Sequence, residues 1–152
     1  MKANWMLFPG LAILILLSFQ VPVAAGQDLQ LVVIGNDKGV PANLKLSEAR
    51  AIFKGEKRRW KDRTKVVIAL MRSSCSIGAQ VSRKLYHLSP DDFNKHWIAQ
   101  VFRGKASAPK YFLTEKELIA FVNSTPGAIG IISAAAADSS ARIIQIDGKK
   151  GL

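Results

Sequence analysis

The residues best suited to chemistry lie where an apolar run ends in a turn rich in hydroxyl groups. Residues 66–71 are apolar, Arg72 follows them, and a helical pattern begins near residue 76. Three serines stand in or beside this turn: Ser73, Ser74 and Ser76. A strand-to-helix turn directs backbone N–H groups and the positive end of the helix dipole at one point, and arginine adds charge-assisted bonds. Residues 72–78 therefore predict a binding site for phosphate or a similar small oxyanion.

A second polar turn follows the first apolar run, residues 29–34, and contains Asn36. In open α/β sheets, ligand-binding loops follow the ends of strands, so Asn36 is a further candidate ligand-binding residue. Asparagine is also one of the usual turn residues, and both interpretations stay open.

The search for catalytic and metal-binding patterns is negative. The sequence contains no phosphate-binding glycine-rich loop with a lysine, no dinucleotide fingerprint, and no histidine or cysteine pair at metal-ligand spacing. We therefore expect a non-enzymatic protein without a catalytic residue, a metal or a cofactor. Cys75 is the only cysteine, so no intramolecular disulfide forms. It is either a small core residue or, if exposed, a thiol for an intermolecular disulfide.

The first 25 residues have the three parts of a secretory signal peptide. Lys2 precedes an apolar run over residues 6–19, and small residues lead to Ala25. The apolar run is shorter than the ~20 residues that a membrane-spanning helix needs. We predict cleavage after Ala25, a periplasmic location and no membrane span in the mature chain; the alternative is an uncleaved N-terminal anchor.

Residues 26–152 have the size of one domain and remain strongly basic. Removal of Lys2 with the signal peptide lowers the formal charge from +11 to +10. This surplus favours anionic partners, and export makes nucleic acid the least expected of them. The densest basic run spans residues 54–65 and is either a solvated loop or a docking surface for an acidic envelope protein.

Alternating strand and helix patterns predict an α/β domain with a mixed, mainly parallel sheet flanked by helices. Strands are expected at residues 29–34, 65–71, 128–132 and 142–146. Helices are expected at residues 46–54, from residue 76, from Pro90 to Arg103 and from Thr114, and each has apolar residues at helical spacing. In the third helix these are Phe93, Trp97 and Val101. Four aromatic side chains are expected to pack in the core or at its rim: Trp60, Trp97, Phe102 and Phe112.

One combination of segments resembles a known family. Residues 46–55, then Trp60, a strand ending in Arg72, and residues 125–131 are similar to the phosphate-binding proteins of bacterial ABC transporters. The likeness is greater to the short, single-lobe relatives with the periplasmic-binding-protein-like fold of type 2, and it covers most of residues 29–133.

In the full-length family, an arginine before a Gly-Ser-Gly-Thr turn at a helix start holds the phosphate. Arg72 matches that arginine, and the turn here keeps hydroxyl groups at Ser74 and Ser76. The resemblance implies an exported solute-binding protein with the length of one lobe, whose site a second copy in a homodimer, or another partner, could complete. The alternative is a periplasmic interaction module that kept the lobe and lost the ligand site.

Overall fold

The computed structural model describes residues 28–152, and the predicted signal peptide, residues 1–25, lies outside them. The elements are, in chain order, β1 (Leu31–Gly35), β2 (Asn43–Leu44), α1 (Leu46–Phe53), β3 (Val67–Met71), α2 (Ser76–Tyr86), α3 (Pro90–Phe102), β4 (Lys110–Phe112), α4 (Glu115–Ser124), β5 (Ala128–Ser133), the 3₁₀-helix η1 (Ala134–Ala136) and β6 (Ile143–Ile146). Every helix and strand expected from the sequence is present within a few residues of its expected bounds.

The strands form one sheet in the order β2-β6-β1-β5-β3-β4. β3 runs parallel to both β4 and β5, and β2 runs parallel to β6. β1 is antiparallel to its neighbours β5 and β6. The predicted mixed, mainly parallel sheet is confirmed, and the direction of β1 decides which loops share an edge of the sheet.

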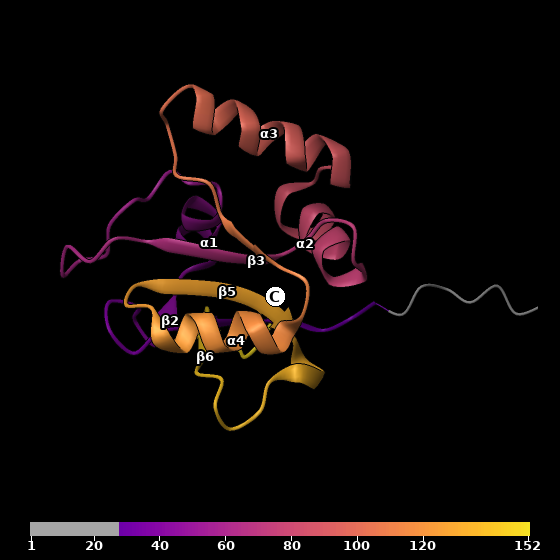
Figure 1. Cartoon of the computed structure of the whole chain (residues 1–152). Coiled ribbons are helices and arrows are strands. Elements are labelled where there is room, and N and C mark those ends of the chain that lie inside the picture. The colour runs from indigo at the N-terminus through magenta and orange to yellow at the C-terminus, as the bar shows by residue number, and fades with distance from the viewer. Residues whose placement is uncertain (1–27) are drawn as a thin grey trace, which may run out of the picture.

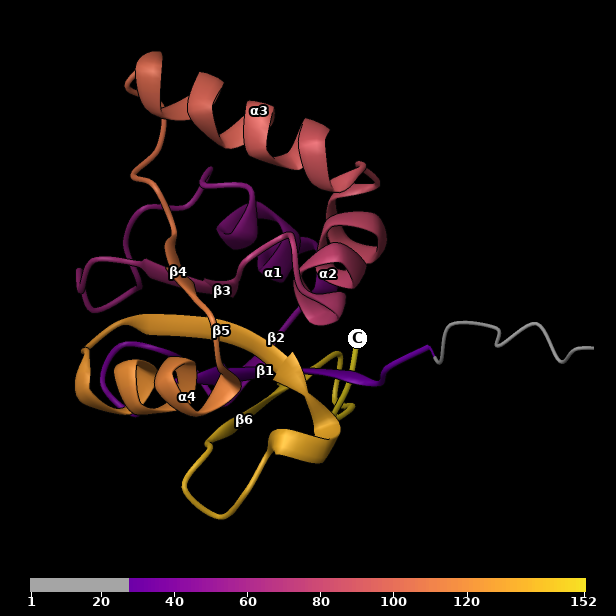
Figure 2. The ribbon, with the colours of Figure 1, turned by 45° about the vertical axis from the view of Figure 1, so that its right-hand side comes forward.

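Helices cover both faces of the sheet. A Cβ atom added at Gly130 of β5 would lie 2.7 Å from Leu118 of α4, so Gly130 faces that helix. The next residue, Ile131, lines a hollow with Val81 and Leu85 of α2, because successive side chains of a strand point to opposite faces. Figures 1 and 2 show α3 farther out, with α1 and α2 between it and the strands. Because both faces are covered, all six residues of β5 are buried.

The helix ends follow their local sequence. Gly55 has a φ of 77° after α1, which is the left-handed conformation expected at a helix C-terminus. Ser89 caps α3 and Pro90 occupies its first turn. The apolar stripe predicted for α3 is confirmed at Phe93 and Trp97, which are buried, and is wrong at Val101, which is 42% exposed.

Three short elements were not expected from the sequence: β2, β4 and η1. Each has only two or three residues, too few to show a periodicity. The packing predicted for Phe102 is also wrong, since its side chain is 87% exposed at the end of α3. Trp60 and Trp97 are buried, and Phe112 is half-buried, as expected.

Candidate functional site

The predicted oxyanion-binding turn lies at the edge of the sheet where three parallel strands end. β4, β3 and β5 are neighbours that run in the same direction, so their carboxyl ends meet at one edge. A helix begins just beyond each end: α4 after β4, α2 after β3 and η1 after β5. Ligands of open α/β sheets bind outside the carboxyl ends of the strands. Residues 72–76 therefore lie where this fold class places its ligands.

Backbone contacts hold the turn on the sheet. The Arg72 N–H donates to the Phe112 carbonyl at 3.0 Å, which continues the β3–β4 ladder by one residue. The Arg72 carbonyl accepts from the Cys75 N–H at 3.0 Å and from the Cys75 thiol at 2.9 Å. Cys75 is half-buried against the core, so it is neither the fully buried core residue nor the exposed thiol that the sequence left open. The turn is thus fixed by its backbone, and its polar side chains point outward.

The side chains of the turn are mostly exposed and have few partners. Arg72, Ser74 and Ser76 are exposed, and none of their side chains has a hydrogen-bond or ion-pair partner within residues 28–152. The Ser73 hydroxyl donates to Asn94 of α3 at 3.1 Å. The guanidinium group and two hydroxyls therefore remain available to a ligand at this edge.

Gly78 explains how the loop packs against the first turn of α2. A Cβ atom at this position would lie 2.0 Å from the Arg72 carbonyl oxygen and 2.5 Å from the Arg72 carbonyl carbon. No side chain fits between the loop and the helix, so only glycine allows this approach. Gly78 thereby fixes the position of Arg72 relative to the start of α2.

The N-terminus of α2 differs from those of the other α-helices that the structure describes. Its N-cap residue, Cys75, makes no side-chain cap bond, and its first turn has no acidic residue, whereas α1, which also lacks a side-chain cap bond, has Glu48 in its first turn. The first intrahelical bond is donated by Ala79 to the Cys75 carbonyl at 2.9 Å. The N–H groups of residues 76–78 consequently have no protein acceptor in the described part of the chain, as is usual for the first turn of an uncapped helix.

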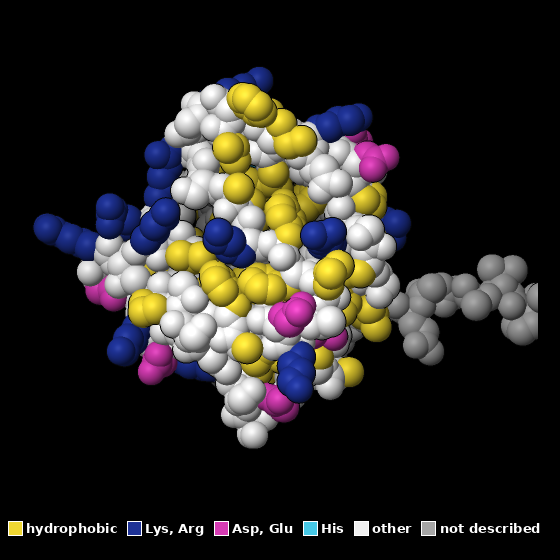
Figure 3. Space-filling model, viewed as in Figure 1, with side chains coloured by type: hydrophobic (Ala, Val, Ile, Leu, Met, Phe, Trp, Pro, Cys, Tyr) yellow, Lys and Arg dark blue, Asp and Glu magenta, His cyan; other side chains and the backbone are white. Residues whose placement is uncertain are grey.

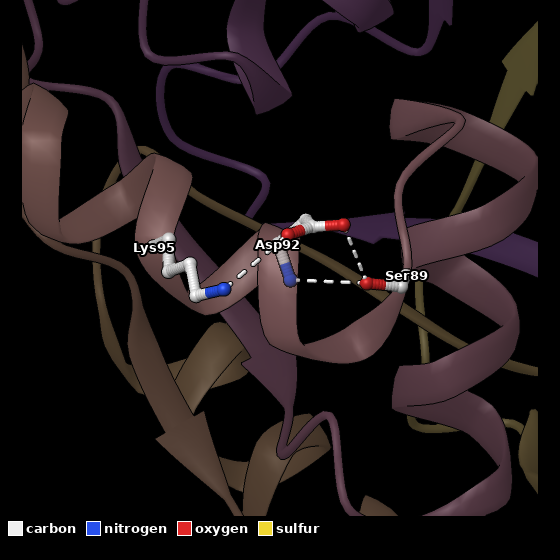
Figure 4. Close-up of polar contacts among 3 residues, drawn as sticks. All are labelled: Ser89, Asp92 and Lys95. Carbon is white, nitrogen blue, oxygen red and sulfur yellow. Dashed lines mark hydrogen bonds and ion pairs between the residues drawn. The ribbon is translucent and has the colours of Figure 1, made fainter.

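The N-terminus of α3, in contrast, is capped by side chains (Figure 4). The Ser89 hydroxyl accepts from the Asp92 N–H at 3.1 Å and donates to the Asp92 carboxylate at 2.8 Å. Lys95 lies 3.6 Å from the same carboxylate. Thr114 caps α4 by accepting from the Glu117 N–H at 3.3 Å. Carboxylates and hydroxyls of the chain itself thus neutralise the positive ends of α3 and α4.

A carboxylate also lies at the same edge as the turn. Glu115, the first residue of α4, accepts from the Ser133 N–H at 2.5 Å and from the Ser133 hydroxyl at 3.2 Å. Ser133 ends β5, and β3 lies between β4 and β5, so this contact spans the carboxyl end of β3. Sequence reasoning missed this pair, because only the strand order brings Glu115 to Ser133. The negative charge of the Glu115 carboxylate repels an anion bound at this edge.

The structure does not bring Asn36 to this edge. Asn36 follows β1, which is antiparallel to β5, so its position is at the opposite ends of the strands. The side chain is buried, with 4% exposed, and its amide donates to the Val122 carbonyl at 2.8 Å and the Asn123 carbonyl at 2.9 Å. Its side-chain oxygen accepts from the Lys38 N–H at 2.8 Å. Asn36 joins the β1 turn to the end of α4.

Metal binding and membrane crossing are two further possibilities for residues 28–152. No group of three or more histidine, cysteine, aspartate or glutamate side chains within residues 28–152 is arranged to hold a metal ion. None of the helices in this part of the chain combines the length and apolar character that crossing a membrane requires.

The fold is that of a phosphate-binding-protein lobe. An ABC-type phosphate transport receptor from Vibrio cholerae superposes with a TM-score of 0.61 at 18% identity, over 82% of this chain and 49% of the receptor. A phosphate ABC transporter substrate-binding protein from Clostridium perfringens, with bound phosphate, gives 0.60 at 15% identity, over 80% and 46%. PstS from Borrelia burgdorferi gives 0.60 at 18% identity, over 80% and 48%.

This chain spans about half the length of those solved structures. No protein-family model and no curated protein matches it by sequence. The periplasmic-binding-protein-like fold predicted from the sequence is therefore confirmed by structure alone.

Proposed function

We propose that this protein is a non-enzymatic solute-binding protein that binds phosphate or a similar oxyanion at the turn of residues 72–78. The observation that carries the proposal is the open N-terminus of α2. Its first-turn N–H groups have no acceptor within residues 28–152, and the exposed Arg72 side chain stands three residues before the N-cap. Phosphate presents the oxygens and the charge that these donors match.

The turn supplies binding groups and no group for chemical change. Arginine remains charged and cannot act as a base, and the exposed serines have no adjacent histidine partner within residues 28–152. Recognition would rest on the N–H groups of α2, the Arg72 guanidinium and the hydroxyls of Ser74 and Ser76. The ligand would leave unchanged, as expected for a transport or sensing role.

A single lobe leaves this site open to water on one side. The matched part of this chain covers about half the length of the solved structures that share the fold. Charge-assisted bonds lose strength when water competes and salt screens them. We therefore expect weak binding, with a dissociation constant of roughly 0.1–1 mM at low salt, corresponding to about 4–5.5 kcal/mol. A second copy or another partner would tighten it by covering the site.

The proposed setting is the periplasm. The N-terminal 25 residues have the pattern of a secretory signal peptide. The fold is shared with binding proteins of phosphate transporters, which supports a role outside the cytoplasm.

The test is isothermal titration of the mature chain, residues 26–152, with phosphate at low ionic strength, with sulfate as competitor. Arg72→Ala should abolish measurable binding without changing the melting temperature. Arg83→Ala is the matched control, since it removes an exposed arginine from the other end of α2. Equal affinity for phosphate in the parent and in Arg72→Ala would show that the turn is not the binding site.

A further inference from the structure

The exposed large hydrophobic side chains of residues 28–152 gather on one surface, which we call the α3–β4 surface. They come from the C-terminal half of α3 and from β4 with the residue after it: Ile98, Val101, Phe102, Tyr111 and Leu113. A groove of about 380 Å³ is lined by all of these except Leu113, with Trp97 and Pro109 also in its wall. Figure 3 shows hydrophobic side chains over α3 and in the hollow beneath it, with lysines and arginines around them.

β4 is also an edge strand, and its unpaired backbone groups lie at this surface. It is the last strand of the sheet and pairs only with β3. The Phe112 carbonyl accepts from the N–H of Arg72, the residue after β3, and alternate residues of a parallel ladder bond to the same neighbour. The N–H and C=O of Tyr111 therefore point away from β3. An unpaired edge flanked by exposed aromatic residues suits the addition of an extended strand.

Strong positive charge lies on the other side of β4. A cleft of about 860 Å³ is lined by five basic side chains and by no acidic one: Lys57, Arg58, Arg59, Lys65 and Lys110. Ala108 lines both this cleft and the apolar groove, so the two hollows adjoin at the residue that stands two positions before β4. The cleft contains part of the basic run, residues 54–65, whose role the sequence left open.

The basic side chains of this cleft are held in place but not all neutralised. Arg58 donates to the carbonyls of Gly104 and Lys105, and Arg59 donates to the carbonyl of Arg63. Lys57 pairs with Glu48. Lys65 and Lys110 have no acidic partner within 4 Å in residues 28–152. Carbonyl bonds fix the arginines without cancelling their charge, so the cleft remains attractive to acidic groups.

We propose that the α3–β4 surface binds an extended acidic segment of another protein, added as a strand along β4. Because neighbouring side chains of a strand point to opposite faces, alternate residues of the bound segment would face the two hollows. Apolar residues would enter the groove beside Phe102 and Tyr111, and acidic residues would face Lys65 and Lys110. Aromatic anchors and charge complementarity would supply affinity and orientation.

The charge of this chain argues against a second copy as the occupant. Pairing two β4 edges would bring two all-basic clefts together in a protein with a formal charge of +11. Like charges brought together in an interface disfavour it. The occupant is therefore an acidic partner, and this inference does not depend on the oxyanion site at residues 72–78.

The probe is a fluorescent ten-residue peptide that alternates glutamate with valine or leucine, measured by anisotropy against the mature chain at low salt. A peptide with lysine at every glutamate position is the charge control. A peptide with N-methylated backbone amides tests strand addition, because methylation removes the donors that pair with the β4 edge. The proposal expects binding of the acidic peptide alone, weakened by salt.

Variants of the surface locate the contact. Phe102→Ser and Lys110→Glu should each lower the affinity for the acidic peptide about tenfold or more. Both side chains are exposed, so neither change should unfold the protein. Lys149→Glu is the matched control, since Lys149 is exposed and lies beyond β6. A Lys110→Glu variant that gains affinity for the lysine peptide would establish the pairing.

Three outcomes would overturn the proposal: equal binding of the acidic and lysine peptides, no effect of Phe102→Ser, or a dimer in analytical ultracentrifugation that Phe102→Ser dissociates. Arg72→Ala should leave peptide binding unchanged, and Phe102→Ser should leave phosphate binding unchanged. Failure at one site is therefore distinguishable from failure at the other.

Discussion

Replacement of Gly78 by alanine tests how the loop is packed on α2, because two physical arguments give opposite signs. Helix propensity alone favours alanine over glycine by about 1 kcal/mol. The structure places the new Cβ atom 2.0 Å from the Arg72 carbonyl oxygen, 2.5 Å from its carbon and 2.9 Å from the Met71 carbonyl oxygen. A relaxed carbon–oxygen contact needs roughly 3.3 Å, so the loop must move by more than ~1 Å.

That movement breaks identifiable contacts. The Arg72 carbonyl would lose the bonds from the Cys75 N–H and thiol, each contributing about 0.5–1.5 kcal/mol. Backbone strain from overpacking adds about 1–3 kcal/mol. After subtracting the gain in helix propensity, we expect Gly78→Ala to lower the free energy of unfolding by about 1–5 kcal/mol, with a middle value of about 3 kcal/mol, or the melting temperature by roughly 10 °C.

The assay is equilibrium urea unfolding of the mature chain, followed by tryptophan fluorescence and circular dichroism. Gly104→Ala is the control, since a Cβ atom there meets nothing within 4 Å and the only cost is its left-handed φ of 63°. We expect that control to lose about 1 kcal/mol. A Gly78→Ala protein as stable as the parent, or more stable, would refute the packing of Arg72 against α2.

Three further predictions concern burial and charge. Asn36→Asp should lower the free energy of unfolding by about 3 kcal/mol or more in a urea titration, since it replaces a buried amide donor with a carboxylate facing two carbonyls; a smaller loss than in Asn36→Ala would contradict this. Glu115→Gln should tighten phosphate binding about twofold to fivefold at low salt in calorimetry, because it removes a negative charge while keeping an acceptor for Ser133; unchanged affinity would place this charge too far from the ligand. Burial raises the pKa of Tyr86 well above its usual value and that of Tyr111 to about 12, so the stability from both neutral rings is complete below pH 10 and lost as the pH rises through the folded-state pKa values. Ultraviolet titration should detect no phenolate near pH 10, and Tyr111→Phe should remove the signal near pH 12. Half of the full two-tyrosine signal at pH 10, as two ordinary tyrosines would give, would contradict the burial.

The sequence predicted the parts of the fold that depend on local pattern. The helices expected at residues 46–54 and from Pro90 are present as α1 and α3, and the expected strand at residues 65–71 is β3, because helix starts and periodicity depend on a few neighbouring residues. The direction of β1 was not predictable, since strand pairing depends on distant residues. Asn36 was a candidate ligand-binding residue because it follows a strand, as Arg72 does, but the antiparallel β1 carries it to the opposite ends of the strands.

The exposure of the apolar side chains on the α3–β4 surface could not be predicted from the sequence either. Val101 continues the apolar stripe of α3, and Phe102 is a large aromatic residue, so both were assigned to packing. The exposed state of these side chains depends on how α3 lies across α2 and on the short edge strand β4. Apolar residues in an amphipathic pattern indicate burial against something, and periodicity alone does not distinguish the chain's own core from another molecule.

The most direct test of the oxyanion site is a ¹H–¹⁵N correlation spectrum of the mature chain during titration with phosphate. Binding at the start of α2 should shift the amide signals of Ser76, Ile77 and Gly78 most, with one saturable curve that Arg72→Ala eliminates. Shifts confined to residues 57–65 and Lys110 would place the anion in the basic cleft instead, and the absence of any saturable shift in the folded protein would contradict oxyanion binding.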